Sequence, residues 1–176
     1  MLEAQDGNLK AIGELYDRHQ KKLYGFFVRL TNNSFCSCDL TQNVFLRILK
    51  FRHTYNPAHQ FRTWMYQIAR NVLSDFYNSK NKLVEYSNDI DNVRHNEIEH
   101  QHGYASREDL VLYRAIGQLS KEQQLLIEMS KFQKLKYEEI ALITNDSVGN
   151  IKVKVHRAIA LLKEKYFEVD RTIDFE

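Results

Sequence analysis

Proline and glycine are scarce in this 176-residue sequence, which has one Pro and six Gly. An all-β fold needs both residue types at its many turns, so their scarcity favours helices. No apolar run approaches the roughly 18 residues that a membrane-spanning helix needs. The first residues, MLEAQDGNLK, also lack the basic-then-apolar pattern of a signal peptide. We therefore expect an all-α protein of one domain or two small ones, cytoplasmic and not inserted into a membrane.

Cysteine is nearly absent too, since Cys36 and Cys38 are the only two in the chain. They lie one residue apart, too close for a useful disulfide. We interpret them as reduced thiols in a turn, and a metal or redox pair is the alternative.

The motifs of catalytic sites are missing. There is no glycine-rich phosphate loop, no His-Glu-x-x-His, no Gly-x-Ser-x-Gly and no pair of cysteine clusters at zinc spacing. His95, His100 and His102 lie together in an acidic stretch, but a segment without periodicity is a poor preorganised metal site. The sequence therefore predicts no catalytic residue, no metal and no cofactor.

Charge is unevenly distributed, although the net charge is only +2. Residues 1–80 hold 11 Lys and Arg against 6 Asp and Glu, and residues 131–165 hold 8 against 4. Between them, residues 81–109 hold 3 against 7. Two basic segments separated by an acidic one are compatible with a chain that contacts a polyanion at two places.

Apolar residues at helical spacing predict three helices in the first 80 residues. The first contains residues 12–30 and ends at a polar turn, the second covers 39–52, and the third covers 61–77 after a loop at 53–60. The second helix is apolar on two sides. One stripe is Leu40, Val44, Ile48 and Phe51, and away from it project Phe45, Leu46 and Leu49. Such a helix is either fully buried or docked against a partner, and both interpretations stay open.

The third helix has a polar face without acids before Asp75, whereas an ordinary solvated helix mixes charges of both signs. That face includes Arg62, Tyr66, Arg70 and Tyr77. Aromatic rings beside cations hold unpaired nucleic-acid strands by stacking. The preceding loop adds side chains that can pocket a splayed base: His53, Tyr55, Asn56 and His59. A purely structural role stays open, and Trp64 within the apolar stripe is better explained as core than as a base-stacking wedge.

Periodicity fails from about Lys80 and returns near Leu110. We interpret residues 81–107 as a flexible acidic linker, residues 108–168 as a second helical domain and residues 169–176 as a C-terminal tail. The first domain then covers residues 1–80.

The second domain has the pattern of a helix-turn-helix. SKEQ (120–123) is a capping box that opens one helix, and YEEIALI (137–143) is a short helix. In the following turn we expect Asn145 to be left-handed and Ser147 to cap the last helix. Five residues then lie on or beside the exposed side of that helix: Asn150, Lys152, Val153, His156 and Arg157. Such groups contact phosphates and base edges in the major groove, and a solvated helix end is the alternative.

Four segments carry a family resemblance: DLTQNVFLRILK (39–50), FRTWMYQIARN (61–71), LSKEQQLLIEM (119–129) and YEEIALITNDSVGNIKVKVHRA (137–158). In this order and spacing they resemble the bacterial sigma factors of the extracytoplasmic-function (ECF) group, in the sigma-70 superfamily. The resemblance covers nearly the whole chain apart from the linker and the last few residues. It implies two helical domains, regions 2 and 4, in a transcription initiation factor without catalytic chemistry.

The resemblance also implies partners. Region 4 would contact the flap of one large subunit of core RNA polymerase, and region 2 would dock on the clamp of the largest subunit through Asp39, Gln42, Asn43, Phe45, Leu46 and Leu49. The non-template single strand of the −10 element would be captured by His53, Tyr55, Asn56, His59, Arg62, Tyr66, Arg70 and Tyr77. The −35 element would be read as duplex DNA by Asn150, Lys152, Val153, His156 and Arg157. An anti-sigma factor is a further implied partner.

Some positions depart from the family pattern. Asn43 replaces a usual carboxylate, and Lys134 and Lys136 replace a usual glycine and serine before the helix-turn-helix. His59 and Gln60 replace a common Gly-Ser, so the promoter sequence stays open.

Two other functions compete with this interpretation. A helix-turn-helix regulator that does not dock on polymerase has no reason for an apolar exterior on helix 39–52 or for an acid-free face on helix 61–77. An enzyme such as a nuclease needs acids that converge near the basic face, and Asp75 alone does not hold a metal.

Overall fold

The computed structural model describes residues 1–86 and 106–173, with side chains for 1–80 and 106–173. Within these ranges the chain is helical and contains no strand, so the all-α prediction is confirmed. The chain divides into two compact units, residues 1–101 and 102–176. In the part of the chain that the structure describes, no helix has the length and apolarity to cross a bilayer.

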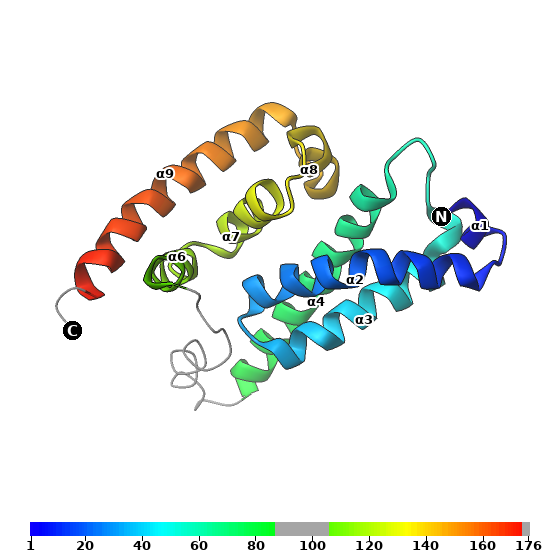
Figure 1. Cartoon of the computed structure of the whole chain (residues 1–176), viewed down its shortest axis with the longest axis horizontal. Helices are drawn as coiled ribbons and strands as arrows, with labels where there is room; N and C mark the ends of the chain where they lie inside the picture. The colour runs from blue at the N-terminus through cyan, green and yellow to red at the C-terminus, as the bar shows by residue number, and fades with distance from the viewer. Residues whose placement is uncertain (87–105, 174–176) are drawn as a thin grey trace. The chain divides into compact units, whose positions relative to one another are not determined.

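The described part of the N-terminal unit is a bundle of three long helices preceded by one short helix. After α1 (Leu2–Gln5) come α2 (Leu9–Thr31), α3 (Ser34–Phe51), a 3-10 turn (Arg52–Thr54) and α4 (Phe61–Tyr86). Helix α3 packs against both α2 and α4, as Figure 1 shows. Each of the three long helices contributes fully buried apolar side chains: Leu23, Phe26, Phe27, Val44, Ile48, Met65 and Ala69. The apolar stripes that predict the helices therefore form one shared core.

The turn between α2 and α3 is tighter than predicted. Asn32 ends α2 in the left-handed conformation with φ 53°, and the Asn33 side chain accepts a hydrogen bond from the Cys36 amide at 2.8 Å. This cap starts α3 at Ser34, five residues before the predicted start. The placement of Cys36 and Cys38 in a turn is therefore wrong, because both lie in the first turns of α3. Both thiols are free.

Helix α4 continues beyond the predicted Tyr77, as far as Tyr86. Residues 78–86 contain neither Pro nor Gly, so nothing in them breaks a helix that tertiary packing has already started. Residues 81–86, which were predicted to belong to the linker, are therefore helical. Residues 87–105, including His95, His100 and His102, lie outside the described residues.

Between residues 106 and 173 the C-terminal unit packs three short helices and a π-helical turn along one long helix. The elements are α6 (Arg107–Gly117), α7 (Lys121–Ile127), the turn (Glu128–Phe132), α8 (Tyr137–Thr144) and α9 (Val148–Ile173). Helices α6, α7 and α8 each pack against α9, which runs along the unit in Figure 1. The helix-turn-helix prediction agrees with α8, its turn and α9.

The predicted caps of this unit are confirmed. The Ser120 side chain accepts from the Gln123 amide, and the Gln123 side chain accepts from the Ser120 amide, which completes the capping box. Asn145 is left-handed with φ 55°, and the Ser147 hydroxyl accepts from the Asn150 amide at 3.1 Å.

The predicted C-terminal tail is helical as far as Ile173. Val169 is buried and packs on Val111 of α6, and the Arg107 guanidinium pairs with Asp170 at 3.1 Å. The apolar face of α6 explains the extension, because the last turns of α9 bury it.

Candidate nucleic-acid and partner interfaces

The loop at residues 53–60 closes on itself through its own polar groups. The Tyr55 hydroxyl donates to the His59 carbonyl at 2.7 Å, and the Ala58 amide donates to the Asn56 side chain at 2.9 Å. The His59 amide donates to the Asn56 carbonyl at 3.1 Å. His53, Asn56 and His59 are exposed, as a contact with a ligand requires. The loop thus presents these polar side chains from a hydrogen-bonded frame.

An aromatic cluster supports this loop. The Tyr55 ring lies 5.4 Å from Trp64 and 6.3 Å from Phe61, between ring centroids, and Phe61 also lies 5.3 Å from the His19 ring. Trp64 is half-buried, so it is neither a core residue nor a free wedge. The cluster joins the loop to the first turn of α4 and to α2.

Three cations surround His19 of α2. Burial lowers the pKa of His19, and the nearby cations Lys22, Arg18 and Arg62 lower it further. Of these cations Arg62 lies in the first turn of α4, which the His19 ring reaches through Phe61. The start of α4 is therefore suited to an anion.

Two tyrosines predicted on the polar face of α4 are not free to stack on a base. Tyr66 is only 2% exposed and its ring lies 5.3 Å from Phe26, so its prediction as an exposed contact is wrong. Tyr77 is half-buried and its hydroxyl donates to the Leu30 carbonyl at 2.6 Å. Burial raises the pKa of Tyr77 to about 12. The physical reason is that α4 faces α2 as well as α3, which widens its buried side beyond one stripe.

The rest of that face keeps its polar character. Gln67, Asn71 and Ser74 are exposed, and Arg62 and Arg70 are half-buried. The one acid, Asp75, is paired with Arg47 of α3 at 2.8 Å. This ion pair reduces the negative field of Asp75 along the face. Its partner Arg47 was not singled out from the sequence, because residues 28 positions apart give no local signal.

Helix α3 carries an exposed apolar residue among polar ones. Leu46 is 65% exposed, and Asp39, Gln42 and Asn43 are exposed beside it. Leu49 is half-buried. Phe45 is only 7% exposed and its ring meets Tyr16 at 4.8 Å, so it lies in the core and not on the outward face where it was predicted. The two-sided apolar pattern thus divides into a core residue, Phe45, and an outward residue, Leu46.

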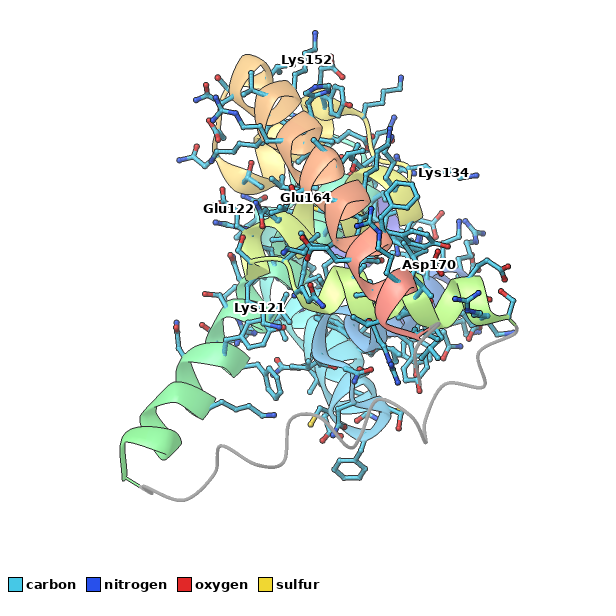
Figure 2. All side chains as sticks on the ribbon, turned by 90° about the vertical axis from the view of Figure 1, so that its left-hand side faces the viewer. Lys121, Glu122, Lys134, Lys152, Glu164 and Asp170 are labelled. Carbon is cyan, nitrogen blue, oxygen red and sulfur yellow. The ribbon has the colours of Figure 1, made fainter. Side chains whose placement is uncertain are left out.

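The N-terminal half of α9 presents all five predicted residues to solvent. Asn150, Lys152, His156 and Arg157 are exposed, and Val153 is 48% exposed. In Figure 2 the Lys152 side chain extends away from the other helices of this unit. The inward positions Ile151, Val155 and Ala158 are buried. The exposed strip is therefore available to a partner.

A polar network fixes the start of α9. Asp146 accepts from the Ser147 amide at 2.7 Å and from the Asn150 side chain at 3.0 Å. Lys154 pairs with Asp146 at 3.0 Å and with Glu122 of α7 at 2.8 Å. The hydrogen bond from Lys154 lowers the pKa of Asp146, and those from Lys154 to Glu122 and then Asp146 raise the pKa of Lys154. Sequence reasoning missed Lys154, which joins α9 to α7 through Glu122. The Asn150 side-chain amide is partly engaged by Asp146.

The turn before α8 contains the two lysines that depart from the family pattern. Lys134 has φ 52°, the left-handed region that glycine adopts without strain. The Lys136 amide donates to Glu139 at 2.8 Å, but an ammonium group cannot accept the reciprocal bond of a capping box. The turn therefore forms although Lys134 is in a conformation that favours glycine and Lys136 cannot complete the capping box.

No group of three or more His, Cys, Asp and Glu side chains in the described ranges is arranged to hold a metal ion. The prediction for the linker histidines is not tested, because they lie outside those ranges.

Family models match both units. The model of sigma-70 region 2 matches residues 15–83, and that of sigma-70 region 4 matches residues 109–162. Together the two matches cover more than half of the chain.

Whole proteins are similar as well. The chain is 27% identical to the RNA polymerase sigma factor CarQ of Myxococcus xanthus in an alignment 187 residues long, which includes 97% of each chain. It is 27% identical to the ECF RNA polymerase sigma factor SigM of Bacillus subtilis over 157 residues, 88% of this chain and 94% of SigM. It is 28% identical to the longer ECF RNA polymerase sigma factor BldN of Streptomyces coelicolor and covers 61% of that protein.

Solved structures share the fold. The sigma factor RpoE of Bartonella quintana, solved with the anti-sigma factor NepR, aligns with a TM-score of 0.71 at 24% identity, over 89% of this chain and 96% of that one. CnrH, solved with the cytosolic domain of CnrY, aligns with a TM-score of 0.69 at 19% identity, over 93% and 92% of the two chains.

Proposed function

The chain belongs to the sigma-70 family of transcription initiation factors, in its ECF group, and we propose that it binds core RNA polymerase and directs it to specific promoters. Sigma factors are not enzymes, and we propose no catalytic residue, metal or cofactor for this chain. Its partners would be core polymerase, promoter DNA and an anti-sigma factor. Because the first two lie in the bacterial cytoplasm, we propose that the chain acts there.

The exposed apolar surface of α3 is the observation that carries the proposal. Leu46 lies outward among Asp39, Gln42 and Asn43, and a regulator that does not dock on polymerase has no use for it. An apolar residue ringed by polar ones is typical of a contact that excludes water at its centre. We assign this surface, with half-buried Leu49 at its edge, to the clamp of the largest polymerase subunit. Phe45 is not part of it.

The loop and the start of α4 are assigned to the single-stranded −10 element. Removing a base from its stack costs a few kcal/mol. A loop already closed by Tyr55 and Asn56 loses little conformational entropy on binding, so more of its interaction energy is left to offset that cost. His53, Asn56 and His59 would contact the base, and Arg62 and Arg70 the phosphates. Tyr66 is excluded from this set, and the Tyr77 hydroxyl is already engaged.

The exposed strip of α9 is assigned to the −35 element. Lys152 and Arg157 reach phosphates or guanine edges, and Val153 can pack against a thymine methyl group. Asn150 and His156 complete the strip. Region 4 would also contact the polymerase flap.

The test is co-elution of the purified chain with core polymerase that lacks any sigma factor, measured by gel filtration. We expect a stable complex with the wild type and a weakened one with Leu46→Ser, which removes an outward side chain and leaves the fold intact. Leu9→Ser is the matched control, because Leu9 is equally outward at 64% exposure in the same unit.

Clean separation of the wild type from a core enzyme that is active with another sigma factor would contradict the proposal. That outcome favours the alternative, a helix-turn-helix regulator or a factor that needs a third component. Co-elution of Leu46→Ser at wild-type strength would remove Leu46 from the docking surface. Stable co-elution of the wild type would justify a search for its promoters by run-off transcription on genomic fragments.

A further inference from the structure

The short helix α1 is hydrogen-bonded to the entrance of the loop at 53–60. The side-chain amide nitrogen of Gln5 donates to the Arg52 carbonyl at 3.0 Å and to the Tyr55 carbonyl at 2.9 Å. A primary amide has two hydrogens, so one half-buried side chain binds both ends of the turn from Arg52 to Tyr55. No signal in the sequence links residues that are 47 and 50 positions apart.

This turn decides the direction in which the chain leaves α3. The Tyr55 amide reaches the Arg52 carbonyl at 3.3 Å, a long bond for a single 3-10 turn. The Gln5 amide adds a second constraint at the same place. Tyr55 then carries the constraint across the loop, because its ring contacts Trp64 and its hydroxyl binds the His59 carbonyl. A shift of the Tyr55 backbone would therefore move the far side of the loop.

Helix α1 is held in place well enough to act as a brace. A helix of four residues is not stable by itself in water. Ala4 is fully buried, and the Glu3 carboxylate accepts from the Asn8 side chain at 3.2 Å. The burial of Ala4 thus fixes the backbone from which Gln5 reaches the loop, and the solvent-exposed bond between Glu3 and Asn8 contributes little to it.

We propose that Gln5 is a positioning residue for the single-strand-capturing loop, acting through the carbonyls of Arg52 and Tyr55. The proposal deepens the function assigned to the loop and rests on it. Gln5 does not contact DNA; it sets the geometry in which Asn56 and His59 meet an unpaired base.

Two substitutions test this role, with a matched control. Gln5→Met keeps the length and volume of the side chain but removes both donors. Gln5→Glu turns carboxylate oxygens toward the two carbonyl oxygens, so its effect is larger. Glu3→Ala is the control, because Glu3 lies in the same helix, is exposed and bonds to Asn8 rather than to the loop.

The first measurement needs no DNA. Hydrogen exchange of the Ala58 and His59 amides reports on the loop in the full chain, because both amides are hydrogen-bonded within it. We expect exchange about tenfold faster in Gln5→Met, which corresponds to about 1.4 kcal/mol, and unchanged exchange in Glu3→Ala. Equal exchange in Gln5→Met and Glu3→Ala would overturn the brace.

The second measurement uses the chain bound to core polymerase and a pool of fluorescent single-stranded DNA of random sequence. For the strand that the wild type selects, we expect roughly tenfold weaker binding by Gln5→Met, weaker binding still by Gln5→Glu, and relaxed base preference. Co-elution with core polymerase and the helical signal should be unchanged. Wild-type affinity and base preference in Gln5→Met would overturn the positioning role.

The two measurements separate this proposal from the function on which it rests. If the wild type neither co-elutes with core polymerase nor selects a strand, the assigned function of the loop fails, and with it the positioning role. The exchange result still decides whether Gln5 braces the loop.

Discussion

The two units differ in how well their surfaces could be predicted from periodicity. In the C-terminal unit all five predicted contact residues of α9 are exposed. In the N-terminal unit Phe45 and Tyr66 were predicted on outward faces and are buried. The N-terminal half of α9 packs with neighbours on one side, whereas α3 and α4 each meet other helices on two sides. A stripe pattern therefore predicts a surface only where a helix has a single packed face.

Tyr66 gives the most direct test of the difference between the two units. Because its ring is buried against Phe26, we expect Tyr66→Ala to destabilise the N-terminal unit by about 3–5 kcal/mol. Urea unfolding followed by hydrogen exchange in each unit measures the effect separately for the two units. Arg157→Ala, on an exposed face, is the control and should change stability by less than about 0.5 kcal/mol. An unchanged stability in Tyr66→Ala, with loss of single-strand binding, would restore Tyr66 as a DNA contact.

Tyr77 provides a pH test of the same packing. Its pKa is raised to about 12 in the folded state, so its stabilising effect is present below its ordinary pKa of about 10 and is lost as the pH rises from 10 through 12. We expect the wild type to lose about 2–3 kcal/mol more than Tyr77→Phe across this window. Unfolding curves of the two proteins at pH 9 and pH 12 give the loss in free energy of unfolding for each. The difference between the two losses isolates Tyr77, because the other groups titrate in both proteins. Parallel loss in both proteins would show that the Tyr77 hydroxyl is not held as the structure has it.

The outward face of α9 gives the converse test. We expect Arg157→Ala to weaken binding to a selected upstream duplex by about 1–3 kcal/mol with relaxed specificity if Arg157 contacts a base. If it contacts a phosphate, the salt slope should fall by about 1 and specificity should stay the same. Fluorescence anisotropy over a salt series distinguishes these results. Lys163→Ala is the control, because Lys163 is exposed on the same helix outside the predicted strip. If Arg157→Ala has the same affinity and salt slope as Lys163→Ala, Arg157 is not part of the interface.

The smallest effect is expected in the turn before α8. Lys134 is held at φ 52°, where a side chain costs about 1 kcal/mol. Lys134→Gly should therefore stabilise the C-terminal unit by up to about 1 kcal/mol, less the greater entropy of glycine in the unfolded chain. Thermal unfolding of the full chain, with Lys131→Gly as a control at a normal φ, measures the sign. A destabilised Lys134→Gly would show that the lysine side chain contributes contacts that outweigh the strain.

Much of the fold follows from local signals. Ser120, Asn145 and Ser147 were predicted at their caps and turn because each acts through atoms a few residues away. The start of α3 was misplaced because the capping role of Asn33 competes with an equally good turn interpretation of the same residues. The end of α9 was misplaced because its last turns are stabilised by α6, which is distant in sequence.

In the candidate sites, too, some features follow from local sequence signals and others depend on contacts between helices. Composition and helical spacing predicted that the chain is helical, and four ordered segments resemble those of the sigma factors. These signals depend on residue type and spacing alone. Only the tertiary structure decided that Phe45 and Tyr66 belong to the core, that Asp75 pairs with Arg47, and that Gln5 binds the carbonyls of the loop. Those outcomes depend on which helix faces meet, and residues that meet across helices carry no periodic signal of their contact.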